Sequence, residues 1–209
     1  PAHTPGTVAF KDIFELKPGH FGIYNSSGLH TEKYWSLISK PHEDSLKTTC
    51  EKTKFLLEDA ITKQLDTKKS LCTFLSGGLD SSIITLYASN YYQNKKSDTL
   101  TTFSVDYKDN DKNFVKTDFQ PNSDNYYIDI MKNKLGTKHK VVMLDTPELA
   151  NALEDAMIAR DCPGMADVDF SLLAFCKDIR THVKVALSGE CADEIFGGYP
   201  WYRDPKIRS

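Results

Sequence analysis

A turn between a hydrophobic run and a helical segment limits the fold of this chain more than any other stretch. Residues 71–92 read LCTFLSGGLDSSIITLYASNYY, in which Ser-Gly-Gly ends the apolar run and Asp80, Ser81 and Ser82 open the helical pattern. Glycines permit a tight turn, and Asp or Ser at a helix start can bind its free backbone N–H groups. The stretch therefore predicts a buried strand at about 70–75 that leads directly into a helix ending near residue 92.

The chain repeats this alternation from Pro41 onward. Apolar spacing predicts further helices at 42–66, 123–134, 147–160 and 169–181, and further strands at 99–107, 139–145 and 183–187. Strands that alternate with helices indicate an α/β fold, in which a parallel sheet carries helices on both faces.

The first forty residues have a different character. They are rich in Pro, Gly and Ser, with short β-prone pieces at 13–16 and 21–24 and turn residues at 18–19 and 25–28. The chain begins without Met and its last letters, RDPKIRS, form no closing element. We therefore expect a piece of a longer protein, in which a short β-rich remnant at 1–40 precedes the main unit at 41–209.

Composition excludes several classes of function. The 209 residues are 40% hydrophobic with a net charge of −3, which gives no electrostatic footprint for nucleic acid. No apolar run is long enough to span a bilayer, and no signal peptide opens the chain, so no membrane partner is expected.

The five cysteines are odd in number and include no C-x-x-C pair, which favours a reducing cytoplasm. Cys50 and Cys72 are expected to be small buried side chains. The histidines show no metal-ligand spacing, and we expect His139 and His182 to be structural or solvent-facing.

A second turn, ALSGECADE at 186–194, has the same pattern as the first: Ser-Gly follows an apolar run and an Asp comes shortly after. Ligands of parallel sheets bind beyond the carboxyl ends of the strands, where helix N-termini attract anions. An acidic side chain beside a polyphosphate would repel it unless a divalent cation lies between them. Asp80 and Asp193 could supply the carboxylates that bind such a cation. The alternative is that each turn only caps a helix. A Walker-type phosphate loop is disfavoured because no Lys follows the glycines.

These residues carry a family resemblance. SGGLDSS resembles the pyrophosphate-loop signature of ATP pyrophosphatases. FLSGGLDSS, TFSVDY, GTKH and LSGECADEIFGGY together resemble the synthetase domain of class B, glutamine-hydrolysing asparagine synthetases, and separate the chain from GMP, NAD and argininosuccinate synthetases. The resemblance covers most of 42–202 and implies an adenine nucleotide alpha hydrolase-like fold, truncated at its C-terminus. Residues 1–40 are similar to the tail of that family's N-terminal glutaminase domain and its linker.

The resemblance also implies a set of site residues. Nucleotide binding would fall to Phe74, Ser76, Gly77, Gly78, Asp80, Ser81, Ser82, Val105, Ser188 and Gly189. Within this set the first turn would wrap the β,γ-pyrophosphate, the strand ends would meet adenine through backbone groups, and the second turn would contact adenosine. Glu190 and Asp193 would act at the reacting centre, and Asp80 and Asp193 would hold Mg²⁺. Cys191 stands where the family more usually has glycine.

The implied activity is ATP-dependent synthesis of asparagine from aspartate through β-aspartyl-AMP, with ammonia taken from glutamine or from solution. A homodimer is a further expectation. Two alternatives stay open: a related adenylating enzyme of the β-lactam synthetase or peptide cyclase type, and an ATP-binding fragment without turnover. The family places a lysine for the α-phosphate after the FGGY sequence, and Lys206 is not expected to replace it.

Overall fold

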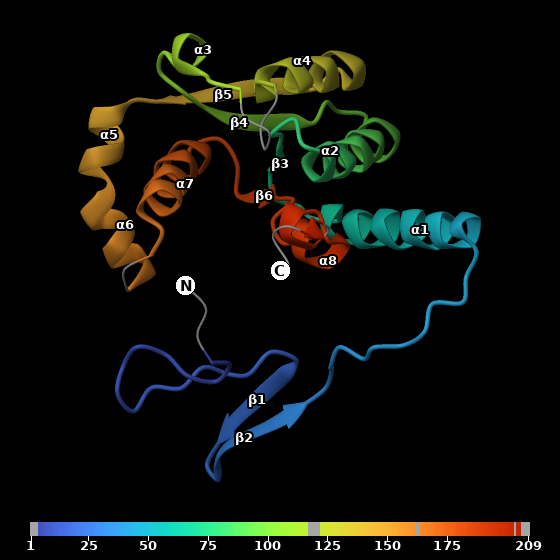
Figure 1. Cartoon of the computed structure of the whole chain (residues 1–209), viewed down its shortest axis with the longest axis vertical. Helices are drawn as coiled ribbons and strands as arrows, with labels where there is room; N and C mark the ends of the chain where they lie inside the picture. Colours follow the sequence, from blue (N-terminus) through green and yellow to red (C-terminus); the bar gives the residue numbers. More distant parts are fainter. Residues whose placement is uncertain (1–3, 117–121, 162–163, 203, 206–209) are drawn as a thin grey trace.

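A four-stranded parallel sheet forms the centre of the molecule. The structure is a computed structural model that describes residues 4–116, 122–161, 164–202 and 204–205 (Figure 1). The strands run in the order β5-β4-β3-β6, and every neighbouring pair is parallel. Their bounds are β3 Leu71–Phe74, β4 Thr101–Tyr107, β5 Lys138–Leu144 and β6 Val185–Leu187. The predicted parallel α/β sheet is thus confirmed.

Helices cover both faces of this sheet, as Figure 1 shows. One face carries α1 Leu46–Leu65, α2 Leu79–Tyr91 and α4 Asp124–Leu135. The other carries α7 Ala166–Ile179, with α5 Thr146–Asn151 and α6 Leu153–Arg160 beside it. Shorter pieces are the π-helical turn η1 Tyr92–Lys96, α3 Asn110–Asn113, α8 Ala192–Phe196 and η2 Pro200–Tyr202.

Two apolar cores hold the helices to the sheet. Cys72, Phe103 and Val142 pack against Phe175 and Ile179 of α7 on one face. The core on the other face joins α1 and α2 to β3, and consists of Ile61, Leu65, Leu71, Ala88, Tyr92 and Leu100. Burial of these side chains is the main favourable contribution to folding. The turns at the carboxyl end of the sheet therefore extend from a well-packed body.

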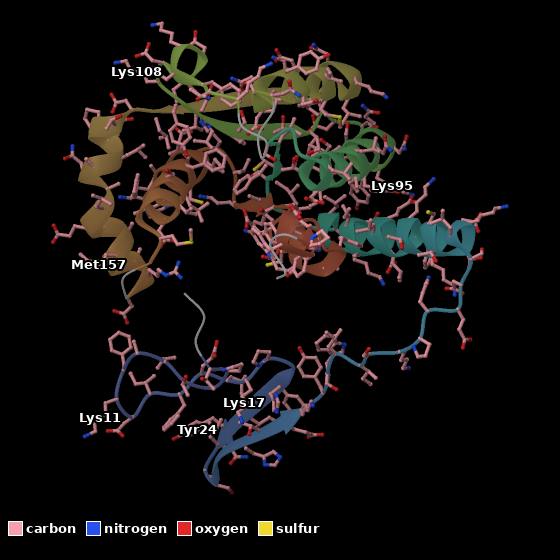
Figure 2. The ribbon with its side chains drawn as sticks, viewed as in Figure 1. Lys11, Lys17, Tyr24, Lys95, Lys108 and Met157 are labelled. Carbon is pink, nitrogen blue, oxygen red and sulfur yellow. The ribbon has the colours of Figure 1, made fainter. Side chains whose placement is uncertain are left out.

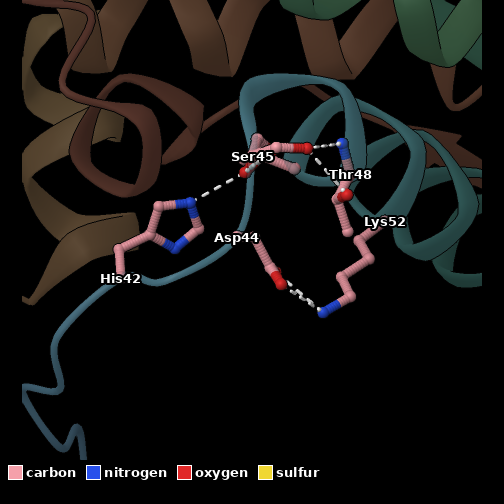
Figure 3. A network of polar contacts seen from close by, with 6 residues as sticks. His42, Asp44, Ser45, Thr48 and Lys52 are labelled. Carbon is pink, nitrogen blue, oxygen red and sulfur yellow. Dashed lines mark hydrogen bonds and ion pairs between the residues drawn. The ribbon is translucent and has the colours of Figure 1, made fainter.

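Two helix boundaries differ from the prediction for identifiable reasons. The helix predicted from residue 42 begins at Leu46, because the Ser45 hydroxyl accepts the Thr48 N–H at 3.2 Å and so caps it (Figure 3). The 2.7 Å ion pair of Asp44 with Lys52 holds the preceding segment in place and lowers the pKa of Asp44 (Figure 3).

The segment predicted as one helix at 147–160 forms two helices. A capping box between Asp145 and Glu148 starts α5, and Ala152 separates α5 from α6. The N–H of Ala152 bonds to the carbonyls of both Glu148 and Leu149, which tightens the last turn of α5. Helical spacing alone does not locate such a break.

The N-terminal region forms a separate antiparallel hairpin of β1 His20–Asn25 and β2 Gly28–Lys33. The Asn25 side chain accepts the Ser27 N–H at 2.8 Å, and Gly28 takes a left-handed φ of 101°. The strand expected at 21–24 is confirmed, whereas 13–16 is not a strand. The hairpin stands apart from the α/β body (Figure 1) and exposes large side chains, including Tyr24 at 83% (Figure 2).

The two cysteines singled out in the sequence differ in exposure. Cys72 is fully buried in β3, where desolvation raises the pKa of its thiol to about 12, as expected for a small core residue. Cys50 is exposed on α1, so its predicted burial was wrong. Over the ranges that the structure describes, no helix has both the length and the apolar character needed to cross a membrane.

Candidate functional site

A cavity of about 730 Å³ lies at the carboxyl end of the sheet. The ends of β3 and β4, the turns after β3 and β6, α4 and α7 all contribute to its wall. Its volume falls within the range of about 300–1,000 Å³ that is typical of small-ligand sites. Its polar and strand-end lining includes Phe74, Ser76, Gly78, Asp80, Ser81, Ser104, Val105, Asp124, Ser188, Gly189, Glu190, Cys191, Asp193 and Tyr199.

The two glycines of the first turn have different structural roles. Gly77 has a left-handed φ of 82°, and a Cβ there would lie 2.7 Å from the Asp124 carbonyl oxygen of α4. Gly78 precedes α2, and a Cβ there would meet only the Ser76 hydroxyl, at 3.4 Å. Gly77 thus allows α4 to pack against the turn, whereas Gly78 leaves open space on the cavity side.

Serine hydroxyls fix the shape of the first turn. The Ser81 hydroxyl donates to the Gly78 carbonyl at 3.1 Å and accepts the Ser76 N–H at 3.2 Å. The Ser76 and Ser81 hydroxyls lie 3.0 Å apart. Because these bonds close the turn on itself, the N-terminal end of α2 is held at the cavity with its positive dipole end toward the space a ligand would fill.

The second turn packs directly on the first. A Cβ on Gly189 would lie 3.1 Å from the Asp80 Cβ and 3.2 Å from the Ser81 backbone nitrogen. The Glu190 N–H donates to the Ser188 hydroxyl at 3.3 Å, and Cys191 then takes a left-handed φ of 70°. The two Ser-Gly sequences, more than a hundred residues apart in the chain, therefore form one continuous wall.

The two glycines that follow α8, Gly197 and Gly198, leave room for Asp193. The N–H of Gly198 donates to the Asp193 carbonyl at 3.0 Å, and a Cβ on Gly198 would overlap the Asp193 carboxylate. Tyr199 donates its hydroxyl to Glu194 at 3.1 Å, and this bond to a carboxylate raises the pKa of Tyr199. Asp193 is thus held on a short helix whose following glycines bring the backbone close to it.

The wall of the cavity is acidic. Asp80, Asp124, Glu190 and Asp193 line it, and none of the described lining residues is Lys or Arg. Within the described ranges, no three His, Cys, Asp or Glu side chains are arranged to hold a metal. Two carboxylates together with substrate phosphates are nevertheless a common ligand set for Mg²⁺. The residues present therefore fit a cation that arrives with a polyphosphate.

Ten of the twelve predicted site residues line this cavity. Gly77 and Ser82 do not, because Gly77 faces α4 and Ser82 lies further along α2. Lys206 lies outside the described residues. Sequence reasoning missed Asp124 and the α7 wall, because no motif marks them. It also missed Ser104, although this residue lies in the TFSVDY motif beside the predicted Val105. The Ser-Asp pair at 123–124, typical of a helix start, was the one available signal for Asp124.

The amino-acid sequence matches one family of known proteins. The asparagine synthase family model matches residues 52–209. Over its full 209 residues the chain is 45% identical to glutamine-hydrolyzing asparagine synthetase 3 of Bacillus subtilis, covering 34% of that protein. It is 27% identical to glutamine-hydrolyzing asparagine synthetase 1 of the same organism, over 92% of the chain and 28% of the relative.

A relative with a different name also matches. Over 93% of its length the chain is 28% identical to the amidase chyE of Penicillium rubens, of which it covers 30%. The chain thus spans about a third of the length of these curated relatives.

Proposed function

The chain belongs to the asparagine synthase family, and from this we propose that it forms the ATP-binding part of an enzyme that makes asparagine from aspartate. In the proposed reaction the aspartate side-chain carboxylate attacks the α-phosphorus of ATP and pyrophosphate leaves. Ammonia then attacks the β-carbonyl of the aspartyl adenylate, and AMP leaves. The observation that carries the proposal is the contact between two Ser-Gly turns at the wall of the cavity.

The polar groups of the two turns suit the parts of ATP. Ser76, Gly78 and Ser81 offer hydroxyl and backbone groups at the start of α2, where a pyrophosphate would be favoured. Phe74 and Val105 line the cavity at the ends of β3 and β4, and we propose that they contact the adenine, while Ser188 and Gly189 contact the adenosine. We propose that Glu190, the next residue in the second turn, acts at the reacting centre. Such a site acts mainly by positioning the reactants and stabilising charge.

The acidic wall supports a requirement for Mg²⁺. Four carboxylates facing a polyphosphate would repel it, and the described lining residues supply no cation to offset them. We propose that Asp80 and Asp193 hold the cation together with pyrophosphate oxygens. Bound there, Mg²⁺ would neutralise the charge of the leaving group.

The remaining parts of the proposal concern the whole protein. We propose that ammonia comes from glutamine through a preceding domain, of which residues 1–40 form the end. We also propose that residues 41–209 belong to the synthetase domain, and that the enzyme works in the cytoplasm as a homodimer. The similarity to the amidase chyE supports a second candidate, an adenylating enzyme that forms an amide with a different acceptor.

Calorimetric titration with ATP and Mg²⁺ tests the nucleotide site. We expect one site in the wild-type chain and a loss of about 100-fold in affinity for Gly78→Val, because the new side chain fills the space where phosphate must approach. The variant should keep its melting temperature, since a Cβ at Gly78 meets only one hydroxyl. Unchanged affinity in Gly78→Val would refute the phosphate site.

A turnover assay separates the candidate functions. The chain is mixed with ATP, Mg²⁺, aspartate and ammonium, and AMP, pyrophosphate and asparagine are measured. Because no described lining residue supplies a cation for the α-phosphate, we expect turnover on the order of 10²- to 10³-fold slower than in a chain extended to the length of the relatives. Equal rates would contradict this expectation, and an extended chain that uses another acceptor would favour the second candidate.

A further inference from the structure

A histidine connects buried hydroxyl groups behind the cavity wall. His139 on β5 places Nδ1 2.9 Å from the Thr102 hydroxyl and Nε2 3.1 Å from the Ser104 hydroxyl, both on β4. The Thr102 hydroxyl also lies 3.2 Å from that of Thr137. Thr102 and Ser104 are 0% and 4% exposed, and Ser104 lines the cavity. The imidazole thus spans two side chains on the same face of one strand.

β4 loses one of its two neighbouring strands before it ends. β3 pairs with β4 only as far as Phe74 opposite Phe103, and the Leu75 N–H then donates to the Phe103 carbonyl at 2.8 Å. From Ser104 to Tyr107 the ladder of β4 continues with β5 alone. The side of β4 that β3 leaves unpaired is where Ser104, Val105 and Tyr107 reach the cavity. The hydrogen bond from His139 to Ser104 is therefore a side-chain support at the point where β4 loses one of its two partners.

The surroundings of His139 favour the neutral form of its ring. Burial lowers the pKa of His139, and Lys132 on α4 lowers it further, while Asp129 on the same helix opposes this shift. A neutral imidazole has one donor and one acceptor nitrogen, so it can donate to one hydroxyl and accept from the other. Both ring nitrogens thus have suitable partners, and the ring holds a fixed orientation between Thr102 and Ser104.

We propose that His139 is a positioning residue for the nucleotide site. Through the Ser104 hydroxyl it holds the end of β4, which pairs with β5 alone, against the bound base. This inference rests on the proposed function, because it takes the ligand beside Val105 to be the adenine of ATP. His139 is absent from the cavity lining, so its contribution passes through Ser104, which both bonds to the imidazole and lines the cavity.

Two amide substitutions separate this role from general support of the fold. The amide of His139→Gln reaches about as far as Nε2 and can still bond to Ser104, whereas the shorter amide of His139→Asn reaches only about as far as Nδ1, next to Thr102. Ser104→Ala removes the other partner. Affinity for ATP with Mg²⁺ is measured by calorimetry, and the melting temperature of each variant is measured in parallel.

We expect His139→Gln to retain ATP affinity within about threefold, and His139→Asn and Ser104→Ala each to lose about tenfold. Equal ATP affinities for the Gln and Asn variants would overturn the positioning role. Losses of ATP affinity that run parallel to the decreases in melting temperature among the variants would overturn it as well. A wild-type chain without affinity for ATP would overturn the proposed function and this inference together. Wild-type affinity with equal Gln and Asn variants would overturn the inference alone.

Discussion

The two Ser-Gly turns share a sequence pattern but differ in how the backbone is held. The first turn places Gly77 at its left-handed position and leads into α2, which has 13 residues. The second places Cys191 at a left-handed position and leads into α8, which has 5 residues. A left-handed φ suits glycine and strains a residue that carries a Cβ. The first turn is therefore relaxed and anchored in the fold, whereas the second is strained.

The two turns also differ in their contacts. Gly77 packs against the Asp124 carbonyl of α4, so the first turn is part of the packing between helices. Gly189 packs against Asp80 and Ser81 of the first turn. The second turn is thus positioned by the first. Substitution of Gly77 should therefore affect folding, while substitutions in the second turn should act on the ligand or on local strain.

The largest effect is expected for Gly77→Ala. The new methyl group would strain the left-handed φ of 82° and approach the Asp124 carbonyl to 2.7 Å, so we expect a loss of about 3 kcal/mol in the free energy of unfolding. Gly136→Ala is a matched control, because Gly136 has a left-handed φ of 63° with nothing within 4 Å of its Cβ position. Urea denaturation should give a loss of about 1 kcal/mol for the control. Equal losses would show that the contact with α4 contributes nothing.

Asp193→Asn should have an intermediate effect that depends on the cation. If Asp193 holds Mg²⁺ beside pyrophosphate, its loss should weaken pyrophosphate binding about tenfold with Mg²⁺ present and little without it. Calorimetry in both conditions measures this difference. Asp155→Asn on α6, which is not part of the cavity wall, is a control for the loss of one surface charge. The same loss in both conditions would indicate that Asp193 only starts a helix.

The smallest effect is expected for Cys191→Gly, and it should be stabilising. Glycine adopts the left-handed φ of 70° without strain, so the variant should gain about 1 kcal/mol in the free energy of unfolding. Cys50→Ala is the control, because it removes an exposed thiol and changes nothing else. Cys50→Gly is unsuitable, because a glycine inside α1 would itself destabilise the helix. A Cys191→Gly variant less stable than the wild type in urea would contradict the strain assigned to the second turn.

The sequence predicted the parts of the fold that depend on local pattern. Strands were predicted around Leu71–Phe74 and Thr101–Tyr107, and both are confirmed. Runs of apolar and β-branched residues of this length are typical of strands that are buried in a parallel sheet. Helix boundaries were less predictable, since the start of α1 depends on the Ser45 cap and the break at Ala152 on local backbone geometry.

The site was predictable only where a motif marks it. The repeated Ser-Gly turns, each at the end of a predicted parallel strand, indicated a ligand site at the carboxyl end of the sheet, where the cavity lies. The contact of Gly77 with Asp124, and the bonds of His139 to Ser104, join segments that are 35 or more residues apart. Periodicity reports the burial of a segment but not its partner, so these contacts required the folded chain.

Amide hydrogen exchange of the wild-type chain, with and without ATP and Mg²⁺, would show whether the two turns form one nucleotide site. Backbone N–H groups that bind phosphate or lie under the nucleotide exchange more slowly. We predict slower exchange on ligand addition at both 76–82 and 188–191, with little change in the hairpin at 20–33. Slower exchange at only one of the two turns, or at neither, would contradict a joint site.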